Sequence, residues 1–453
     1  MSGHLQIQPF SKQVQGSIQI PGSKSLTNRA LILAALANGK TLLEGCLFSE
    51  DTEIMSDALS RLGIKVERDK EKRTVEVTGN GANFKVKEAE LFVGNAGTAA
   101  RFLTAMLCLF AGGTYHLDGT PAMRKRPMQG LLLTLRKLGA QITFHEEEWH
   151  FPFTLETMGL PGGIWDVDAS QSSQILSALL IAAPLAREAV QLKLTGETVS
   201  KPFVKMTVDM MKDFGAKISG DGLSTTIIEP IESYAAKASL QIEPDATAAS
   251  YFMMLPGLVG GHVKLPGLNQ TMLQGDIGFE AVLREIGMNL EFSNGSMMSS
   301  STKLKLQGGN FDFNPISDTF LTMAAAAPLL KGPTHIYGIA HTRKQETDRV
   351  HAMATELRKL GQRVDETEDS LRIVPDLDAL KVRAVKKPEI ETYSDHRVAM
   401  SFGILGSYDL LGDGSPWLKI LDPNCCAKTF PDFFVKLKAL LQASLHSLVH
   451  RSI

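Results

Sequence analysis

Residues 21–40, PGSKSLTNRALILAALANGK, place a short polar and cationic segment directly before an apolar helix. Lys24, Ser25 and Arg29 belong to the polar segment, and the helix that follows is apolar on nearly every side. Such a helix is expected to be buried on several faces. The free N–H groups and the dipole of its first turn attract anions. The stretch therefore predicts a buried helix with a small anion held at its start.

The same plan recurs along the chain. Polar clusters precede six apolar helices, at intervals of 71 to 77 residues by subtraction, and they are centred on Ser25, Thr98, Ser173, Thr247, Asp318 and Asp395. In five further segments a helix gives way to an alternating strand at a glycine, namely Gly63, Gly139, Gly215, Gly287 and Gly361. Glycine closes helices because it adopts the left-handed conformation without strain. The repeats predict an α/β fold of six helix-strand units, three in each of two domains, with the helices buried and the strands outside.

Composition excludes several classes of function. The 453 residues carry a formal net charge of -2, which argues against a nucleic-acid or anionic-membrane partner. The N-terminal segment lacks the pattern of a signal peptide, and no apolar run is long enough to span a membrane. The four cysteines form no CxxC pair, as is typical of a reducing compartment. We therefore expect a cytoplasmic protein with no nucleic-acid or membrane partner.

Cations gather at the helix starts and in three loops. Arginine suits bidentate capture of carboxylate or phosphate, and lysine supplies a point charge for phosphate. Any one of these cations alone is best explained as a solvated surface charge. As a set they indicate a site for small polyanions. They are Lys24, Arg29, Arg101 and Arg397 at helix starts, and Arg124, Lys125, Arg126, Arg343, Lys344, Arg349 and Lys428 in loops.

Longer motifs point to one family. They are PGSKSLTNRALILAALANG (21–39), GNAGTAARFLTA (94–105), SQSSQILSALL (170–180), DATAASYF (245–252), GDIGF (275–279), QETDR (345–349), YSDHRVAM (393–400) and AKTFPDFF (427–434). In this order, and over nearly the whole chain, they resemble the 5-enolpyruvylshikimate-3-phosphate synthase family. The resemblance implies a transferase that moves the enolpyruvyl group of phosphoenolpyruvate to the 5-hydroxyl of shikimate 3-phosphate and releases phosphate. That reaction belongs to the shikimate pathway, which supplies chorismate and the aromatic amino acids.

The resemblance also implies an architecture. The family fold has two inside-out α/β domains around a substrate cleft, here expected at 21–243 and at 1–20 with 244–453. The first would bind mainly shikimate 3-phosphate, and the second would contribute mainly phosphoenolpyruvate and catalytic residues. A monomer that needs no cofactor is expected.

Substrate-binding residues follow from the motifs that match. For shikimate 3-phosphate the resemblance implies Lys24, Ser25, Arg29, Ser172, Ser173, Gln174, Ser200, Asp318, His341 and Gln345. For phosphoenolpyruvate it implies Lys24, Gly97, Arg126, Gln174, Arg349, Arg397 and Lys428. The resemblance also implies a glyphosate target, because Gly97 would leave the small space that the family uses for glyphosate to compete with phosphoenolpyruvate.

Three residues are expected to carry the chemistry. Asp318 would accept the proton of the attacking hydroxyl, because nearby cations favour an ionised carboxylate. Glu346 and Lys24 are both candidates for delivering a proton to the methylene carbon. No metal is expected, since the one HxxxH spacing, His446 with His450, lies in the C-terminal tail without a carboxylate beside it.

Five positions depart from the family pattern. Gln345 stands where many members have Lys, His341 replaces Asn, Phe203 replaces Tyr, Ala122 replaces Arg, and Phe102 stands where Pro is frequent. Lost hydrogen bonds typically cost about 1 kcal/mol each. We therefore expect weaker substrate binding with the chemistry intact.

Two other functions fit less well. The enolpyruvyl transferase that acts on UDP-N-acetylglucosamine carries a Cys in the loop before its RP motif, whereas residues 117–128 here contain none. A non-catalytic repeat scaffold or anion sensor would tolerate loss of Asp318, Glu346 and Lys24, and all three are present. Phosphate release distinguishes both alternatives, because the first would use UDP-N-acetylglucosamine as acceptor and the second would bind the anions without releasing phosphate.

Overall fold

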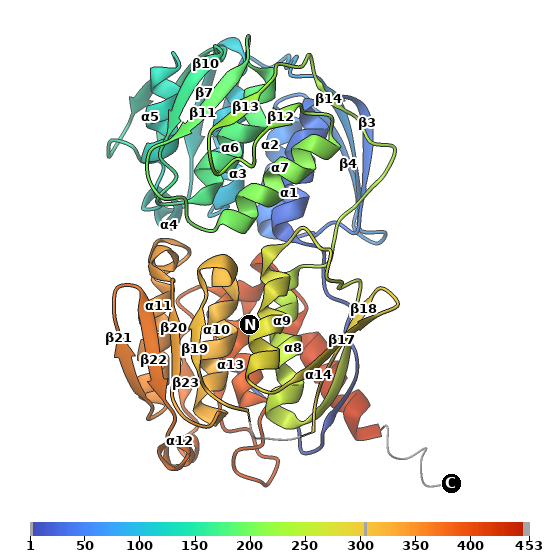
Figure 1. The fold of residues 1–453 in the computed structure, drawn as a ribbon, viewed down its shortest axis with the longest axis vertical. Coiled ribbons are helices and arrows are strands. Elements are labelled where there is room, and N and C mark those ends of the chain that lie inside the picture. The colour runs from blue at the N-terminus through green and yellow to red at the C-terminus, as the bar shows by residue number, and fades with distance from the viewer. Residues whose placement is uncertain (1–2, 303–305, 447–453) are drawn as a thin grey trace. The chain divides into compact units, whose positions relative to one another are not determined.

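The computed structural model describes residues 3–302 and 306–446. The chain forms two compact units, one spanning Gly22–Glu243 and the other made of the segment up to Pro21 together with the segment from Pro244 on. Figure 1 shows that each unit has helices at its centre and sheets around them. In the described part of the chain no helix is both long enough and apolar enough to cross a membrane.

Three buried helices form the centre of the 22–243 unit. They are α1 (Lys24–Leu36), α3 (Gly97–Leu107) and α6 (Ser173–Ala182). Their residues are buried along almost the whole length, as their uniformly apolar sequences predict. More polar helices cover them: α2 (Glu50–Arg61), α4 (Pro121–Arg124), α5 (Gln129–Lys137) and α7 (Lys201–Asp213), with the 3-10 turn η1 (Ala183–Leu185).

Three sheets enclose these helices. The first has the order β14 (Tyr234–Ala235), β3 (Ala37–Glu44), β5 (Thr74–Asn80) and β4 (Lys65–Asp69), with β15 (Leu240–Gln241) also paired to β3. The second has the order β6 (Glu88–Phe92), β7 (Ala111–Asp118), β9 (Phe153–Met158) and β8 (Gln141–Phe144). The third has the order β10 (Gly163–Val167), β11 (Val190–Leu194), β13 (Thr226–Ile228) and β12 (Ile218–Ser219).

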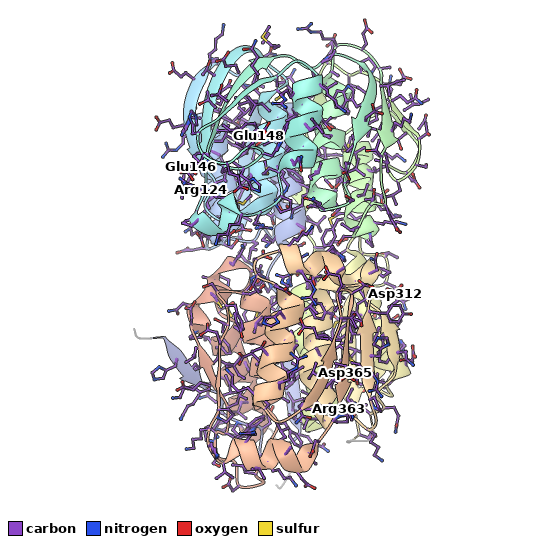
Figure 2. The ribbon with its side chains drawn as sticks, turned by 90° about the vertical axis from the view of Figure 1, so that its left-hand side faces the viewer. Arg124, Glu146, Glu148, Asp312, Arg363 and Asp365 are labelled. Carbon is purple, nitrogen blue, oxygen red and sulfur yellow. The ribbon has the colours of Figure 1, made fainter. Side chains whose placement is uncertain are left out.

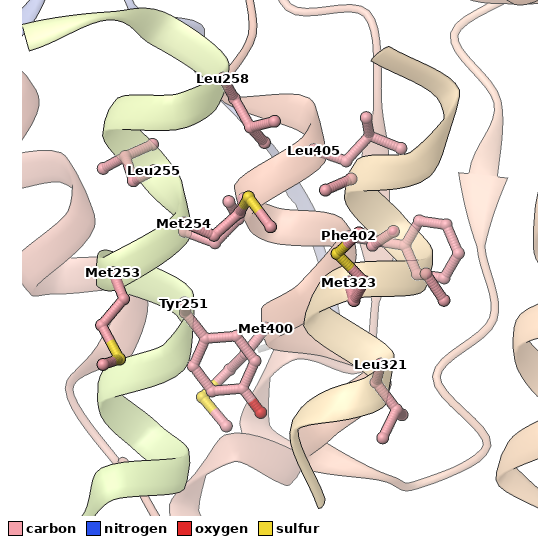
Figure 3. Close-up of a cluster of buried hydrophobic side chains, with 14 of the residues drawn as sticks. Tyr251, Met253, Met254, Leu255, Leu258, Leu321, Met323, Met400, Phe402 and Leu405 are labelled. Carbon is pink, nitrogen blue, oxygen red and sulfur yellow. The ribbon is translucent and has the colours of Figure 1, made fainter. Parts of the chain in front are cut away.

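The other unit repeats this plan. Its central helices are α8 (Ala246–Val259), α10 (Phe320–Ala326) and α13 (His396–Gly406), all buried. Figure 3 shows their apolar side chains interleaved, with Tyr251, Met323 and Met400 among them. The outer helices are α9 (Phe279–Glu285), α11 (Arg349–Lys359), α12 (Leu377–Ala384) and α14 (Phe433–His446), with the turns η2 (Gly275–Gly278), η3 (Asn314–Thr319), η4 (Ala327–Leu329), η5 (Ala340–Lys344) and η6 (Pro423–Lys428).

Its sheets include both N-terminal strands. The first has the order β17 (Asn289–Ser293), β18 (Ser296–Ser301), β16 (Gly261–Pro266) and β2 (Val14–Ser17). The second has the order β19 (Asn310–Asp312), β20 (Thr334–Tyr337), β22 (Ser370–Val374) and β21 (Arg363–Glu366). The third has only three strands in the described residues: β1 (His4–Gln6), β24 (Lys419–Leu421) and β23 (Glu389–Ile390). The sixth repeat therefore borrows a strand from the N-terminus.

The repeat signals of the sequence correspond to real helix ends. The five glycines that were expected to close helices all have positive φ, between 85° and 107°. They follow α2, α5, α7, α9 and α11. A left-handed residue at this position lets the chain leave the helix and enter the next strand. The predicted α/β fold of six helix-strand units is confirmed.

Candidate functional site

The start of α1 carries two cations in different surroundings. Lys24 Nζ lies 3.3 Å from a carboxylate oxygen of Asp51 in α2. Arg29 is 1% exposed, and its Nε donates a hydrogen bond to the Thr207 hydroxyl at 2.7 Å. The N-cap Ser23 accepts a hydrogen bond from within the first turn, which fixes where the helix begins. Both cations are thus held at the end of the helix where anions are favoured.

Two guanidinium groups crowd the start of α3. A Cβ atom on Gly97 would lie 2.6 Å from Arg126 Nη2 and 2.8 Å from Arg101 Nη1, so only glycine fits here without movement. Arg101 Nη1 donates to Gln174 Oε1 at 3.0 Å, and Arg126 Nη1 donates to the backbone carbonyl oxygen of Asn95 at 3.1 Å. Both arginines are buried. The contact between Arg101 and Gln174 joins the starts of α3 and α6.

Hydroxyl groups mark the starts of α6 and α7. Ser172 caps α6 by accepting from the backbone N–H of Gln174 at 3.3 Å, and Ser173 is the first helical residue. Ser200 precedes α7 in the left-handed conformation, with φ 51° and ψ 48°. This conformation is uncommon for a residue other than glycine and is concentrated at functional sites. Hydroxyls and free N–H groups at two helix starts are suited to binding a phosphate group.

The second unit holds a cluster of cations and carboxylates around Arg349. Asp318 accepts from Arg349 Nη1 at 2.9 Å and from Arg397 Nη2 at 2.8 Å. One oxygen of Glu346 accepts from Arg349 Nη2 at 2.8 Å, and the other lies 3.2 Å from Lys428 Nζ. The three cations are at most 8% exposed. Five predicted site residues from separate parts of the sequence therefore meet in this cluster.

Neighbouring carboxylates hold the two arginines in their charged form. Arg349 Nε also donates to Asp395 at 2.7 Å, and Asp395 caps α13 by accepting from the backbone N–H of Arg397 at 2.8 Å. Burial alone lowers the pKa of Arg349, but the charges of Asp395, Glu346 and Asp318 outweigh burial and raise it above its ordinary value. The pKa of Arg397 is raised in the same way, since Asp318 and other neighbours outweigh its burial.

Asp276 is a buried carboxyl beside this cluster that the sequence analysis did not assign. It lies in η2 and accepts a hydrogen bond from the Thr247 hydroxyl at the start of α8. Its Oδ1 has no hydrogen-bond partner among the described residues. Burial, followed by the charge of Asp318, raises the pKa of Asp276 to about 7. The GDIGF motif was the sequence signal that could have identified it.

The segment that departs from the family pattern lies next to Arg349. His341 Nε2 lies 2.9 Å from the Ser317 hydroxyl, and burial lowers the pKa of His341, so its ring is neutral at pH 7. Gln345 accepts a hydrogen bond from Arg349 Nη1. Lys344 is exposed. Among the described residues, no buried contact holds Lys344 beside Gln345, the position at which many family members have a lysine.

Two cations that were grouped with the anion-binding set anchor loops. Arg124 Nε and Nη2 donate to the two carboxylate oxygens of Asp118 at 3.0 and 2.8 Å, and Arg124 also contacts Glu146 (Figure 2). Arg343 contacts Asp348 at 2.8 Å and Glu366 at 3.2 Å. We assign both a role in holding the segments that precede the site residues, because each is paired with carboxylates of the chain itself.

The described residues contain no group of three or more His, Cys, Asp or Glu side chains placed to hold a metal ion. His446 is the last residue of α14, while His450, the other histidine of the HxxxH spacing, lies outside the described residues. Cys46, Cys108, Cys425 and Cys426 are all free thiols.

Comparisons with known proteins agree on one family. The family profile described as EPSP synthase (3-phosphoshikimate 1-carboxyvinyltransferase) matches residues 9–437. A protein of Opitutus terrae named 3-phosphoshikimate 1-carboxyvinyltransferase is 51% identical over 97% of this chain and 98% of its own length. A protein of Escherichia coli with the same name is 42% identical over 97% of this chain and 99% of its own.

Solved structures share the fold. The EPSP synthase of Acinetobacter baumannii matches with a TM-score of 0.76 and 25% identity, covering 97% of this chain and 98% of that one. The enolpyruvyl transferase NikO of Streptomyces tendae matches with a TM-score of 0.74 over 97% of this chain and 98% of its own. At 16% identity the second match speaks for the fold alone.

Proposed function

This chain belongs to the EPSP synthase family, and on that premise we propose that it transfers the enolpyruvyl group of phosphoenolpyruvate to the 5-hydroxyl of shikimate 3-phosphate. The observation that carries the proposal is the double contact of Asp318. Each of its oxygens accepts a hydrogen bond from a buried arginine, Arg349 on one side and Arg397 on the other. Those contacts orient a carboxylate as a base beside two cations that suit a small polyanion.

The proposed reaction proceeds by addition and elimination. Asp318 takes the proton of the 5-hydroxyl as that oxygen bonds to C2 of phosphoenolpyruvate, while a proton is delivered to C3, which becomes a methyl group. Loss of a proton from C3 and of phosphate from C2 then restores the double bond. Lys24 Nζ lies 3.3 Å from Asp51, whereas Glu346 contacts Arg349 and Lys428. We retain both as candidate proton donors.

We propose that each unit mainly serves one substrate. The 22–243 unit would hold shikimate 3-phosphate through Lys24, Ser25, Arg29, Ser172, Ser173, Gln174 and Ser200, with Gly97 and Arg126 reaching phosphoenolpyruvate. The second unit would supply Arg349, Arg397 and Lys428 for phosphoenolpyruvate, Asp318 and Glu346 for the chemistry, and His341 and Gln345 for the shikimate ring. Hydroxyls at helix starts in the first unit and paired cations in the second support this division.

Phosphate release from the purified protein tests the function. Release should require both phosphoenolpyruvate and shikimate 3-phosphate, and it should fall about 10²- to 10⁴-fold in Asp318→Asn, which keeps the shape of the side chain but cannot act as the base. UDP-N-acetylglucosamine serves as the rival acceptor. Release with that acceptor, or full activity of Asp318→Asn, would contradict the proposal.

We further propose that the protein acts as a cytoplasmic monomer. Four free thiols among the described residues suit a reducing compartment. Light scattering of the purified protein should give the mass of a single chain, with and without both substrates. A dimer mass in either condition would contradict this part of the proposal.

A further inference from the structure

The guanidinium of Arg29 is buried without a carboxylate partner. Nε donates to the Thr207 hydroxyl at 2.7 Å, and Nη2 donates to the Ser177 hydroxyl at 3.2 Å and to the backbone carbonyl oxygen of Phe203 at 3.3 Å. Nη1 donates to the carbonyl oxygen of Ser25 at 3.1 Å. All four acceptors are neutral. Burial therefore lowers the pKa of Arg29 to about 9, which still leaves it charged at neutral pH.

Two phenyl rings flank this charge. Cζ of Arg29 lies 5.3 Å from the ring centroid of Phe102 in α3 and 6.0 Å from that of Phe203 in α7. Both distances are within the range of cation-π contacts, which are stronger when water is excluded. Phe102 is 1% exposed. The two aromatic departures from the family pattern thus meet at the same cation.

The four contacts do not use every N–H group of Arg29. They use the single N–H of Nε, both N–H groups of Nη2 and one of the two on Nη1. These hydrogen bonds hold the guanidinium at its edges, while one N–H has no acceptor among them and no carboxylate of the described chain neutralises the charge. A carboxylate partner would compete with an anionic ligand, whereas a phenyl ring stabilises the charge without neutralising it.

We propose that Phe102 and Phe203 form an aromatic clamp that positions the Arg29 guanidinium for an anionic substrate, shikimate 3-phosphate. The substrate in this inference rests on the proposed function. Phe102 and Phe203 are positioning residues, since they act through Arg29. In this chain the clamp makes up for the hydroxyl that Phe203 lacks.

Leucine substitutions test the clamp, because they keep an apolar side chain and remove the ring. Phe102→Leu and Phe203→Leu should each weaken shikimate 3-phosphate binding by about three- to tenfold in calorimetric titrations. The KM for phosphoenolpyruvate should stay within about twofold. Phe203→Tyr, which keeps the ring, is the matched control and should bind at least as tightly as the wild type.

An Arg29→Met background separates the clamp from general packing. If the rings act through Arg29, Phe102→Leu should cost no further affinity once the guanidinium is gone. Equal losses in both backgrounds would overturn the proposal.

A measurement on the free protein distinguishes the aromatic clamp from the proposed function. The Arg29 Nε–H signal in a ¹H–¹⁵N spectrum of the free protein should carry a ring-current shift that Phe102→Leu removes. An unchanged signal would overturn the clamp. Loss of the shift in a protein whose wild type binds no shikimate 3-phosphate would support the clamp and overturn the proposed substrate.

Discussion

The two units use the same helix-start plan but surround their buried arginines differently. Arg29 and Arg349 are each 1% exposed. Arg29 meets neutral oxygens and phenyl rings, and its pKa is lowered to about 9 by burial. Arg349 contacts Asp318, Glu346 and Asp395, whose charges outweigh its burial and raise its pKa. No carboxylate of the described chain neutralises the charge of Arg29, whereas the charge of Arg349 is shared with three carboxylates.

The surroundings of Arg29 suit substrate binding, whereas those of Arg349 suit the proposed chemistry. An anion that approaches Arg29 displaces no carboxylate, so the site gains charge balance when the anion binds. An anion that approaches Arg349 or Arg397 must share them with Asp318, which is the proposed base. Two of the carboxylates that stabilise these arginines, Asp318 and Glu346, are also the proposed base and a candidate proton donor. Replacing Arg349 should therefore lower mainly the stability of the fold, whereas replacing Arg29 should lower mainly the affinity for substrate.

The largest effect is expected for Arg349→Met. This change leaves the carboxylate of Asp395, which is 0% exposed, without its ion-pair partner. Removing one partner of a buried ion pair typically costs about 3–5 kcal/mol. Calorimetry should show a fall in Tm of roughly 10 °C, given the usual dependence of Tm on stability for a unit of this size. A fall of less than about 3 °C would mean that the cluster tolerates the unpaired carboxylate.

Arg29→Met should cost much less stability. The Thr207 hydroxyl keeps its hydrogen bonds to the Ser177 hydroxyl at 2.9 Å and to the carbonyl oxygen of Phe203 at 2.8 Å, so no buried carboxylate loses a partner. We expect the free energy of unfolding to change by about 1 kcal/mol at most, while shikimate 3-phosphate binding falls at least tenfold. A destabilisation as large as that of Arg349→Met would erase the distinction between the two arginines.

Gly97→Ala should affect phosphoenolpyruvate selectively. The added Cβ would lie 2.6 Å from Arg126 Nη2 and 2.8 Å from Arg101 Nη1, so the guanidinium groups must shift. We expect the KM for phosphoenolpyruvate to rise about tenfold, equivalent to roughly 1.4 kcal/mol. The dissociation constant of shikimate 3-phosphate measured without phosphoenolpyruvate should change by less than twofold. Equal effects on both substrates would show that Gly97 serves the whole site.

Asp276→Asn should change how stability depends on pH. The folded-state pKa of Asp276, about 7, lies above its ordinary value of 3.8, so the folded protein holds a proton that the unfolded chain releases between these values. Stability contributed by this proton is lost as pH rises through that window. The wild-type Tm should therefore fall more steeply between pH 5 and 7 than that of Asp276→Asn.

A matched control for this titration is Asp365→Asn. Asp365 lies on β21 of the same unit, exposed and near Arg363 in Figure 2, and it contacts Arg372 at 3.2 Å. Exposed ion pairs contribute little, so the slope of Tm against pH should match the wild type. Parallel curves for Asp276→Asn and the wild type would instead show that Asp276 stays ionised throughout.

Local patterns predicted the repeats because they depend on nearby residues. A glycine such as Gly63 closes its helix through its own backbone conformation, with φ 85°. The apolar run of α1 requires burial whatever its neighbours are. Local patterns did not predict the surroundings of Lys344 and Arg124. The sequence shows that both are charged, but the exposure of Lys344 and the ion pair of Arg124 depend on the shape of the loops.

The sequence analysis did not assign Asp276 for a related reason. Its carboxyl stands out only because it is buried, with one oxygen accepting a hydrogen bond from Thr247 and the other having no hydrogen-bond partner among the described residues. Contacts of this kind join residues far apart in sequence, and no local spacing encodes them.

The sequence by itself determined the α/β fold, the six helix starts and the family, since periodicity, glycine positions and motifs are properties of neighbouring residues. The tertiary structure decided which cations are paired with carboxylates. Arg29 contacts two phenyl rings and neutral oxygens, whereas Arg349 contacts three carboxylates. The physical reason is that the effect of a buried charge depends on the groups within a few ångströms of it, and those groups are assembled only by folding.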